Sequence, residues 1–227
     1  MTPLLLLRPQ PGNDASAARA KAMGLAVIQA PLFEIVASSA KAPPAGPFDA
    51  LLLTSANGVR FGHDLIAAHA DLPLYAVGEA TALPAREEGH ADVIVGRGDA
   101  ASTVPMILRD GHAQVLHICG EDVRDFDSLG ITFVRHAVYR SAEVPEAAVR
   151  GTLEGLDETV AAIHSPRAGR RLNALLNADQ RARIHVAAIS EKAAKACGTG
   201  WASLTVSATP DDTALLACAQ SLCIRAG

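Results

Sequence analysis

The chain has 227 residues, which suits one large domain or two of about 100 residues each. Hydrophobic residues make up 49% of it, so a substantial core can form. The 20 basic and 24 acidic side chains give a net charge of −4, which excludes a global positive field for nucleic acid or an anionic membrane. An anionic ligand would therefore need local contacts.

The N-terminal apolar run covers only residues 4–7, and Pro9 and Pro11 follow it at once. Such a run is too short for a signal peptide, and no other run approaches the length of a membrane span. We therefore expect a cytoplasmic protein that binds neither membranes nor nucleic acid.

The cysteines and histidines lack the spacing of metal ligands. No C-x-x-C pair occurs, and the pairs His63 with His69 and His112 with His117 do not place both rings on one helical turn. We expect no metal site, and we expect the cysteines to be reduced core residues. These cysteines are Cys119, Cys197, Cys218 and Cys223.

The first half of the chain alternates short apolar runs with helical stretches. A strand at residues 4–7 precedes a helix that Asp14 can cap and Gly24 can close, and another strand lies within 24–36. Further strand and helix segments are expected, in order, at residues 50–62, 75–82 and 91–102. Continuous Val, Leu and Ile runs of this kind are typical of parallel strands buried on both faces.

The second half repeats the first when the sequence is shifted along itself by about 111 residues. The aligned pairs are 3–9 with 114–121, 24–36 with 130–142, 50–62 with 160–172, 75–82 with 187–194, and 91–102 with 202–213. This is a tandem duplication of an α/β unit. Each copy is expected to form a flavodoxin-like or Rossmann-like parallel sheet.

Ligands of open parallel sheets bind beyond the carboxyl ends of the strands. The residues at these ends are Arg8, Thr54, Ser55, Gly78, Gly120, His164, Ser165 and Ser190. Each hydroxyl could be a plain helix N-cap, as Ser165 before Pro166 suggests. Hydroxyls at matching positions of two repeats also favour a site, because helix N-termini attract carboxylates and phosphates.

Familiar catalytic motifs are missing. There is no G-x-G-x-x-G after a strand, no Walker sequence and no G-x-S-x-G elbow. His164 precedes Ser165 but has no positioned acid in the sequence, so a catalytic dyad is not predicted. Tyr139 could be a core aromatic, or its phenol could donate a proton into a cleft.

The pieces "LLLLRP", "APLFEIV", "FDALLLTSANGV", "YAVGEATA", "VLHICGED", "AVYRSAE", "IHSPRAGRRL", "AAISEKAA" and "ATPDDTALLACA" together resemble the uroporphyrinogen-III synthase family in order and spacing. The resemblance implies a cofactor-free enzyme of tetrapyrrole biosynthesis. Its substrate would be linear hydroxymethylbilane, which loses water and closes with inversion of ring D through a spiro intermediate. It also implies a monomer that makes a transient contact with the preceding enzyme of the pathway.

The resemblance further implies two interlocked domains joined by a two-stranded linker. Residues 1–36 and 143–227 would form a composite domain, and residues 37–142 would form an inserted domain. The inserted domain has 8 basic and 13 acidic residues, net −5, and the composite domain has 12 and 11, net +1. A substrate with eight carboxylates is therefore expected to rely on the composite domain, through Arg8, Arg167 and backbone amides.

The resemblance also assigns residues. Tyr139 matches the tyrosine that would assist departure of the hydroxyl, while Thr54 with Ser55, Thr81 and Ser165 match hydroxyls of the binding cleft. Lys192 departs from the family, which often has threonine there, and could instead contact a carboxylate. Gly78, His164 and Ser190 complete the expected binding set.

A second hypothesis is a non-catalytic two-domain protein that binds an anionic tetrapyrrole or another small anion. Loss of Tyr139 or of the strand-end hydroxyls would favour it, and the sequence keeps both. The expected catalytic apparatus is small because the pyrrole nitrogen itself drives loss of the hydroxyl group. The harder task, folding a flexible chain for inverted closure, needs positioning rather than a reactive side chain.

Overall fold

The computed structural model describes residues 2–39 and 44–225, which form two compact units. Unit 1 comprises Met1–Glu34 and Ala142–Gly227, and unit 2 comprises Ile35–Ser141. These bounds lie within two residues of the domain boundaries expected from the sequence. Independent folding of either unit remains a prediction.

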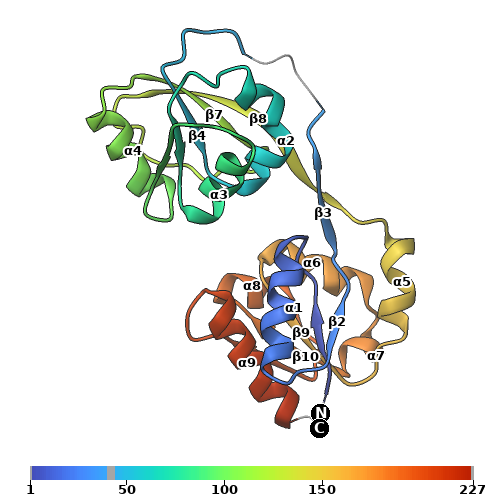
Figure 1. The fold of residues 1–227 in the computed structure, drawn as a ribbon. Helices are drawn as coiled ribbons and strands as arrows, with labels where there is room; N and C mark the ends of the chain where they lie inside the picture. The colour runs from blue at the N-terminus through green and yellow to red at the C-terminus, as the bar shows by residue number, and fades with distance from the viewer. Residues whose placement is uncertain (1, 40–43, 226–227) are drawn as a thin grey trace. The chain divides into compact units, whose positions relative to one another are not determined.

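Unit 1 contains a five-stranded parallel sheet within the described residues, in the order β11-β10-β9-β1-β2 (Figure 1). Its strands are β1 (Leu4–Leu6), β2 (Val27–Gln29), β9 (Thr159–Ile163), β10 (Ile184–Ala188) and β11 (Ser203–Val206). Its helices are α1 (Gly12–Ala22), α5 (Glu146–Glu154), α6 (Pro166–Leu175), α7 (Ala178–Arg181), α8 (Glu191–Ala196) and α9 (Asp212–Arg225).

Helices cover both faces of this sheet, which explains the run of four leucines at 4–7. Leu5 and Leu7 pack with residues of α5, α6 and α8, whereas Leu4 and Leu6 pack with residues of α1 and α9. All four side chains are fully buried. A strand with both faces covered is built mainly from apolar side chains, as the continuous apolar run predicts.

Unit 2 contains a six-stranded sheet in the described part of the chain, in the order β3-β8-β7-β4-β5-β6. Its strands are β3 (Phe33–Ala37), β4 (Ala50–Leu53), β5 (Leu74–Ala76), β6 (Val93–Val95), β7 (Gln114–Gly120) and β8 (Thr132–Glu143). Its helices are α2 (Ala56–Ala67), α3 (Glu79–Glu87) and α4 (Ala100–Arg109). Helices α2 and α3 pack on one face of the sheet and α4 on the other.

Strands β3 and β8 carry the chain between the two units. The amide of Ser38 donates to the carbonyl of Val138, and the amide of Val144 donates to the carbonyl of Leu32. Because the residue number falls along one strand as it rises along the other, this pair is antiparallel. The remaining pairs of the unit 2 sheet, from β8 to β6, are parallel.

The two sheets place the repeated sequence segments at equivalent positions. Strands β11, β10, β9 and β1 correspond to β6, β5, β4 and β7, and each set is in the same spatial order. Residues 51–60 and 161–170 even share one burial pattern. The predicted α/β class with two largely parallel sheets is confirmed.

Two details of the helix ends refine the expectations. Asp14 does not cap α1, because the N-cap is Pro11 and the Asp14 carboxylate instead accepts hydrogen bonds from Gln10 and Gln29. Gly24 does follow the end of α1, with φ of +80°.

No helix in residues 2–39 or 44–225 combines the length and the apolar character needed to cross a bilayer.

Candidate functional site

Each unit brings polar side chains together where its central strands end. In unit 1 this point lies between β1 and β9, and in unit 2 between β7 and β4, where the strand order reverses direction. Ligands of doubly wound sheets bind at such switch points. Each unit therefore has its own candidate binding point.

A cavity of about 310 Å³ opens at the carboxyl ends of the unit 2 strands. Three of the residues singled out from the sequence, Thr54, Gly120 and Tyr139, line it. The other lining residues are Val77, Gly98, Asp99, Ala100, Asp122, Val123, Arg124 and Phe126. Hydroxyl, carboxylate and guanidinium groups thus share a small space with aromatic rings.

The Tyr139 ring lies directly against Gly120. A Cβ atom added at Gly120 would lie 2.7 Å from Cε2 and 3.1 Å from Oη of Tyr139. The ring therefore occupies space that a side chain at position 120 would need. Phe61 is the other aromatic neighbour, with ring centroids 6.1 Å apart. Within the described residues the Tyr139 hydroxyl forms no hydrogen bond, so it is available to a ligand.

Thr54 contacts a buried imidazole. Its Oγ1 lies 3.1 Å from Nε2 of His117, a residue with no exposed surface. Burial, assisted by the positive charge of Arg135, lowers the pKa of His117 to about 4. His117 is therefore neutral near pH 7.

The remaining unit 2 candidates lie at helix starts. Ser55 is the N-cap of α2 and its hydroxyl accepts from the amide of Asn57, and Gly78 is the N-cap of α3. Thr81 lies in the first turn of α3 and is 5% exposed. None of these three residues lines the 310 Å³ cavity.

In unit 1, Arg8 and His164 converge on a carboxylate that the sequence analysis did not select. Asp212 Oδ1 lies 2.7 Å from His164 Nε2 and 3.2 Å from Arg8 Nη1. Arg19 Nη2 is 2.7 Å from Oδ2, and the Ser16 hydroxyl donates to Oδ1 at 2.7 Å. Asp212 begins α9, so its charge also suits the helix dipole.

This cluster corrects the expectation that His164 has no positioned acid. Burial alone would raise the pKa of Asp212, but hydrogen bonds from Ser16, His164 and Arg19 outweigh it and lower the pKa to about 2. Burial also lowers the pKa of His164, against the opposing effect of Asp212. The pair is thus a neutral imidazole donating to a carboxylate. Ser165 is not part of it, so no Ser-His dyad forms.

Ser165 and Ser190 are N-caps of α6 and α8, accepting hydrogen bonds from the amides of Ala168 and Ala193. The predicted start of α6 at Ser165 and Pro166 is confirmed. The Arg167 guanidinium lies over the Phe33 ring, 4.4 Å from its centroid. Lys192 is exposed in the first turn of α8.

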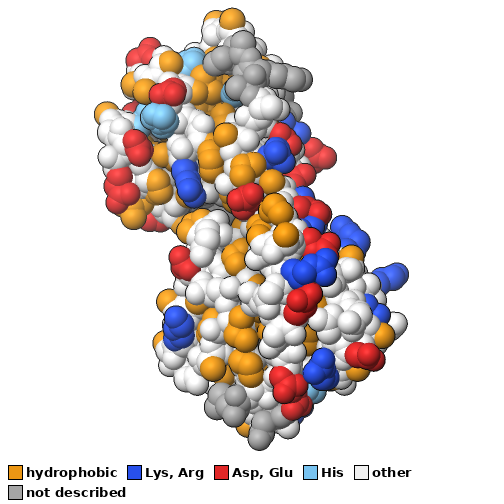
Figure 2. Space-filling model, turned by 90° about the vertical axis from the view of Figure 1, so that its right-hand side faces the viewer, with side chains coloured by type: hydrophobic (Ala, Val, Ile, Leu, Met, Phe, Trp, Pro, Cys, Tyr) orange, Lys and Arg blue, Asp and Glu red, His pale blue; other side chains and the backbone are white. Residues whose placement is uncertain are grey.

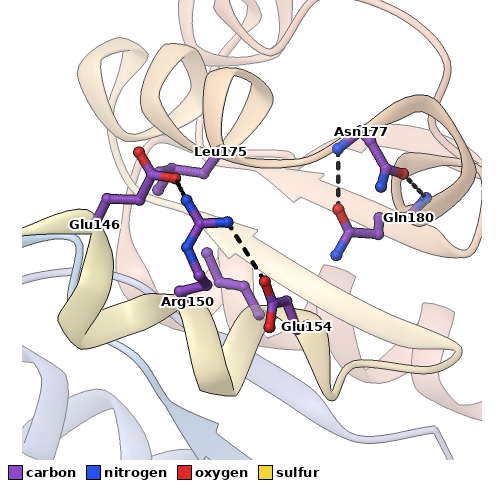
Figure 3. Close-up of a pocket in the computed structure, with 7 residues that line it drawn as sticks. Glu146, Arg150, Glu154, Leu175, Asn177 and Gln180 are labelled. Atoms are coloured by element: carbon purple, nitrogen blue, oxygen red, sulfur yellow. Dashed lines mark hydrogen bonds and ion pairs between the residues drawn. The ribbon is translucent and has the colours of Figure 1, made fainter.

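A cavity of about 230 Å³ in unit 1 lies along α5, and none of the predicted site residues lines it (Figure 3). Arg150 is held there by Glu146 and Glu154, and Asn177 bonds to Gln180. These groups satisfy one another, so this cavity is not the candidate site. In the described part of the chain, no cluster of His, Cys, Asp and Glu could hold a metal ion.

Sequence reasoning missed Asp212, His117 and the contact of Gly120 with Tyr139. A signal was present for the first two. Asp212 lies at a helix start in the repeated segment "ATPDDT", and His117 interrupts the apolar strand "VLHICG". A polar ring in a buried strand requires a hydrogen-bond partner, and the structure identifies that partner as Thr54.

This chain resembles solved structures of uroporphyrinogen-III synthases. The uroporphyrinogen-III synthetase of Helicobacter pylori 26695 has a TM-score of 0.66 at 17% identity, covering 98% of this chain and 100% of that one. A mutant uroporphyrinogen III synthase of Thermus thermophilus has a TM-score of 0.46 at 16% identity, covering 99% and 98%. The first of these shows that the fold is shared.

A search of curated protein sequences finds no match to this chain. The family model described as uroporphyrinogen-III synthase HemD matches residues 14–217, most of the chain. With the fold and the strand-end sites described above, this match shows that the chain belongs to the uroporphyrinogen-III synthase HemD family.

Proposed function

We propose that this protein converts linear hydroxymethylbilane into uroporphyrinogen III, as a hydro-lyase that closes the macrocycle with loss of water and inversion of ring D. Membership of the family supports the reaction. The observation that carries the assignment of a site is the unit 2 cavity at the strand ends. There the Tyr139 hydroxyl, which forms no hydrogen bond within residues 2–39 and 44–225, lies among polar groups.

In the proposed reaction, the C–O bond of the terminal hydroxymethyl group breaks first. The nitrogen of the pyrrole that bears this group supplies the electron pair, and the departing oxygen takes the Tyr139 proton and leaves as water. The cation that remains is delocalised over the ring, so one proton donor suffices. Attack on this cation by a ring carbon of ring D, at the other end of the chain, gives the spiro intermediate from which the inverted ring is formed. The proton that ring D loses on closure restores the Tyr139 hydroxyl.

The substrate carboxylates need several local contacts. In unit 2 we assign Thr54, Ser55, Gly78 and Thr81 to substrate binding. In unit 1 we assign Arg8, His164, Ser165, Arg167, Ser190 and Lys192. Figure 2 shows basic and acidic side chains interspersed on one face of the molecule, which agrees with local rather than global recognition of charge.

We further propose that the protein acts without a cofactor, as a cytoplasmic monomer. The absence of disulfides among Cys119, Cys197, Cys218 and Cys223 suits a reducing compartment. A transient contact with the enzyme that makes hydroxymethylbilane would limit direct closure of the free substrate. Sedimentation of the purified protein, alone and with that enzyme, tests both the monomer and the contact.

The decisive experiment is incubation with freshly made hydroxymethylbilane, followed by oxidation and chromatographic separation of the type I and type III porphyrins. The proposal expects the type III isomer to dominate, while a reaction without protein gives the product of direct closure. Tight binding of the substrate without formation of type III would instead identify a binding protein.

A further inference from the structure

His117 is a buried imidazole for which the proposed reaction has no use. It lies in β7 with no exposed surface, in register with Leu52 of β4 and Arg135 of β8. The Phe126 ring packs against it, with ring centroids 5.7 Å apart. Leucine would fill such a position without the cost of burying two ring nitrogens. The imidazole therefore needs an explanation beyond packing.

Its contact with Thr54 follows from the geometry of the sheet. Side chains two residues apart on a strand point to the same face, so Thr54 continues the face that Leu52 presents. Leu52 is the register partner of His117 on the neighbouring strand, and Oγ1 of Thr54 lies 3.1 Å from Nε2. Thr54 also lines the cavity that Tyr139 lines. Of the two cavity-lining residues that contact His117, Thr54 and Phe126, Thr54 is the one that bonds to the imidazole through a polar atom.

The other ring nitrogen determines the direction of this hydrogen bond. Nδ1 of His117 is buried and has no hydrogen-bond partner among the described residues. A proton on Nδ1 would be a buried donor without an acceptor, which is rare in proteins and costlier than an unused lone pair. The neutral ring therefore carries its proton on Nε2, and Nε2 donates to Oγ1 of Thr54.

We propose that His117 is a positioning residue that holds Thr54 as a hydrogen-bond donor toward the cavity, where its hydroxyl proton binds a carboxylate oxygen of the substrate. Within the described residues, Thr54 has no other side-chain hydrogen bond that could take this proton. The inference deepens the proposed function and rests on it for the identity of the ligand. The hydrogen bond that orients Thr54 can be tested whether or not the protein catalyses this reaction.

The surroundings keep the imidazole in this role. Burial and the nearby positive charge of Arg135 both disfavour a second proton on the ring. A neutral ring has one donor nitrogen, so the direction of the bond to Thr54 does not change near neutral pH. Arg135 itself lies over the Phe126 ring, 5.6 Å from its centroid.

Kinetics of four variants test the proposal. Thr54→Val should raise KM roughly ten- to hundredfold, the value of a hydrogen bond to a charged acceptor, and change kcat less. His117→Leu should raise KM in the same direction, whereas in His117→Gln the amide nitrogen can replace Nε2 and should recover most of that loss. The double variant Thr54→Val with His117→Leu should be no worse than Thr54→Val alone.

A matched control is His90→Leu. His90 is also a buried histidine of unit 2, and its Nε2 contacts the carbonyl of Leu72, outside the cavity. The control should change stability without changing KM. Equal KM values for native protein and folded His117→Leu, or additive losses in the double variant, would overturn the proposal.

The tautomer gives a readout that needs neither turnover nor an active variant. Two-bond ¹⁵N–¹H spectra of the native protein, with the His117 signals assigned by their loss in His117→Gln, should show the proton on Nε2. A proton on Nδ1 would reverse the bond and refute the proposal. If the native protein makes no uroporphyrinogen III, the proposed function fails, while the spectra still decide the role of His117.

Discussion

At the scale of single residues, the two tyrosines of the chain differ in what their hydroxyls contact. Tyr75 is fully buried and donates to Oδ2 of Asp110 at 2.8 Å, whereas the Tyr139 hydroxyl has no partner within the described residues. Burial, with the nearby Asp110, raises the pKa of Tyr75 far above its ordinary value. Only Tyr139 is suited to meet a ligand.

Tyr139→Phe should therefore lower turnover by about 10²-fold, the low end of what general-acid assistance provides. The ring remains, so the free energy of unfolding should change little. The released product should remain type III, because inversion depends on how the cleft holds the substrate. Steady-state rates with isomer analysis measure both. As the control, Tyr75→Phe should cost about 1 kcal/mol of stability and leave turnover unchanged. Normal turnover in Tyr139→Phe together with a large loss of turnover in Tyr75→Phe would exclude Tyr139 as the proton donor.

The buried His117 predicts a pH dependence of stability. Its pKa is about 4 in the folded protein and about 6.5 when unfolded, so between these values the unfolded state binds more protons. The contribution of this site is complete above pH 6.5 and falls by about 3 kcal/mol as the pH falls to 4. Urea unfolding at several pH values should show a smaller decline for His117→Leu than for the native protein. If the free energies of unfolding of the two proteins fell equally with pH, the lowered pKa of His117 would be contradicted.

At the scale of elements, the pairing of β7 with β8 positions the tyrosine. The register shifts between Cys119 and Gly120, so that Gly120 lies opposite Tyr139 at the end of the pair. Such irregularities often redirect a side chain near a site. The missing side chain at position 120 then leaves room for the ring.

Gly120→Ala should displace the Tyr139 ring and lower turnover by roughly tenfold or more, since small errors in position are costly in catalysis. Gly151→Ala is the matched control. It lies within α5, and beyond its chain neighbours and the backbone of its own helix no atom lies within 4 Å of the added Cβ. Alanine should therefore stabilise the helix by about 0.5–1 kcal/mol without affecting turnover. Rates and melting temperatures of the two variants provide the test, and a Gly120→Ala protein with undiminished turnover would contradict the prediction.

At the scale of the whole molecule, the chain order and the spatial order of the strands disagree. Strand β1 lies between β2 and β9, with Leu4 in register with Val160, although most of the sequence separates β1 from β9. A fragment of residues 37–142 should therefore melt cooperatively, because it contains β4 to β7 and most of β8. Residues 1–113 should not, because this sequence repeat lacks both β9 and β7. Calorimetry of the two fragments would show the opposite if the repeat were the folding unit.

Salt should weaken substrate binding more than it slows the reaction. The composite domain expected from the sequence carries net +1 and the inserted domain net −5, so a ligand with eight carboxylates must be held by local cations and helix N-termini. Raising salt to about 0.5 M shortens the Debye length to roughly 4 Å, so KM should rise while kcat changes less. A KM that is independent of salt would indicate apolar recognition instead.

The sequence alone determined the duplication, the α/β class, the helix start at Ser165 and Pro166, and the selection of Tyr139 as a candidate. Each of these depends on a local pattern: apolar runs, capping residues, and the same order of segments written twice. Such patterns say which residues form an element and which end of a strand carries a hydroxyl.

Tertiary structure alone decided which of these residues meet. His164 contacts Asp212, which lies 48 residues further along the chain, and Thr54 contacts His117, which lies 63 residues further along. Both contacts depend on which strands and helices become neighbours and on the direction of each side chain. No local pattern encodes them, because the pairing of strands is a property of the whole sheet.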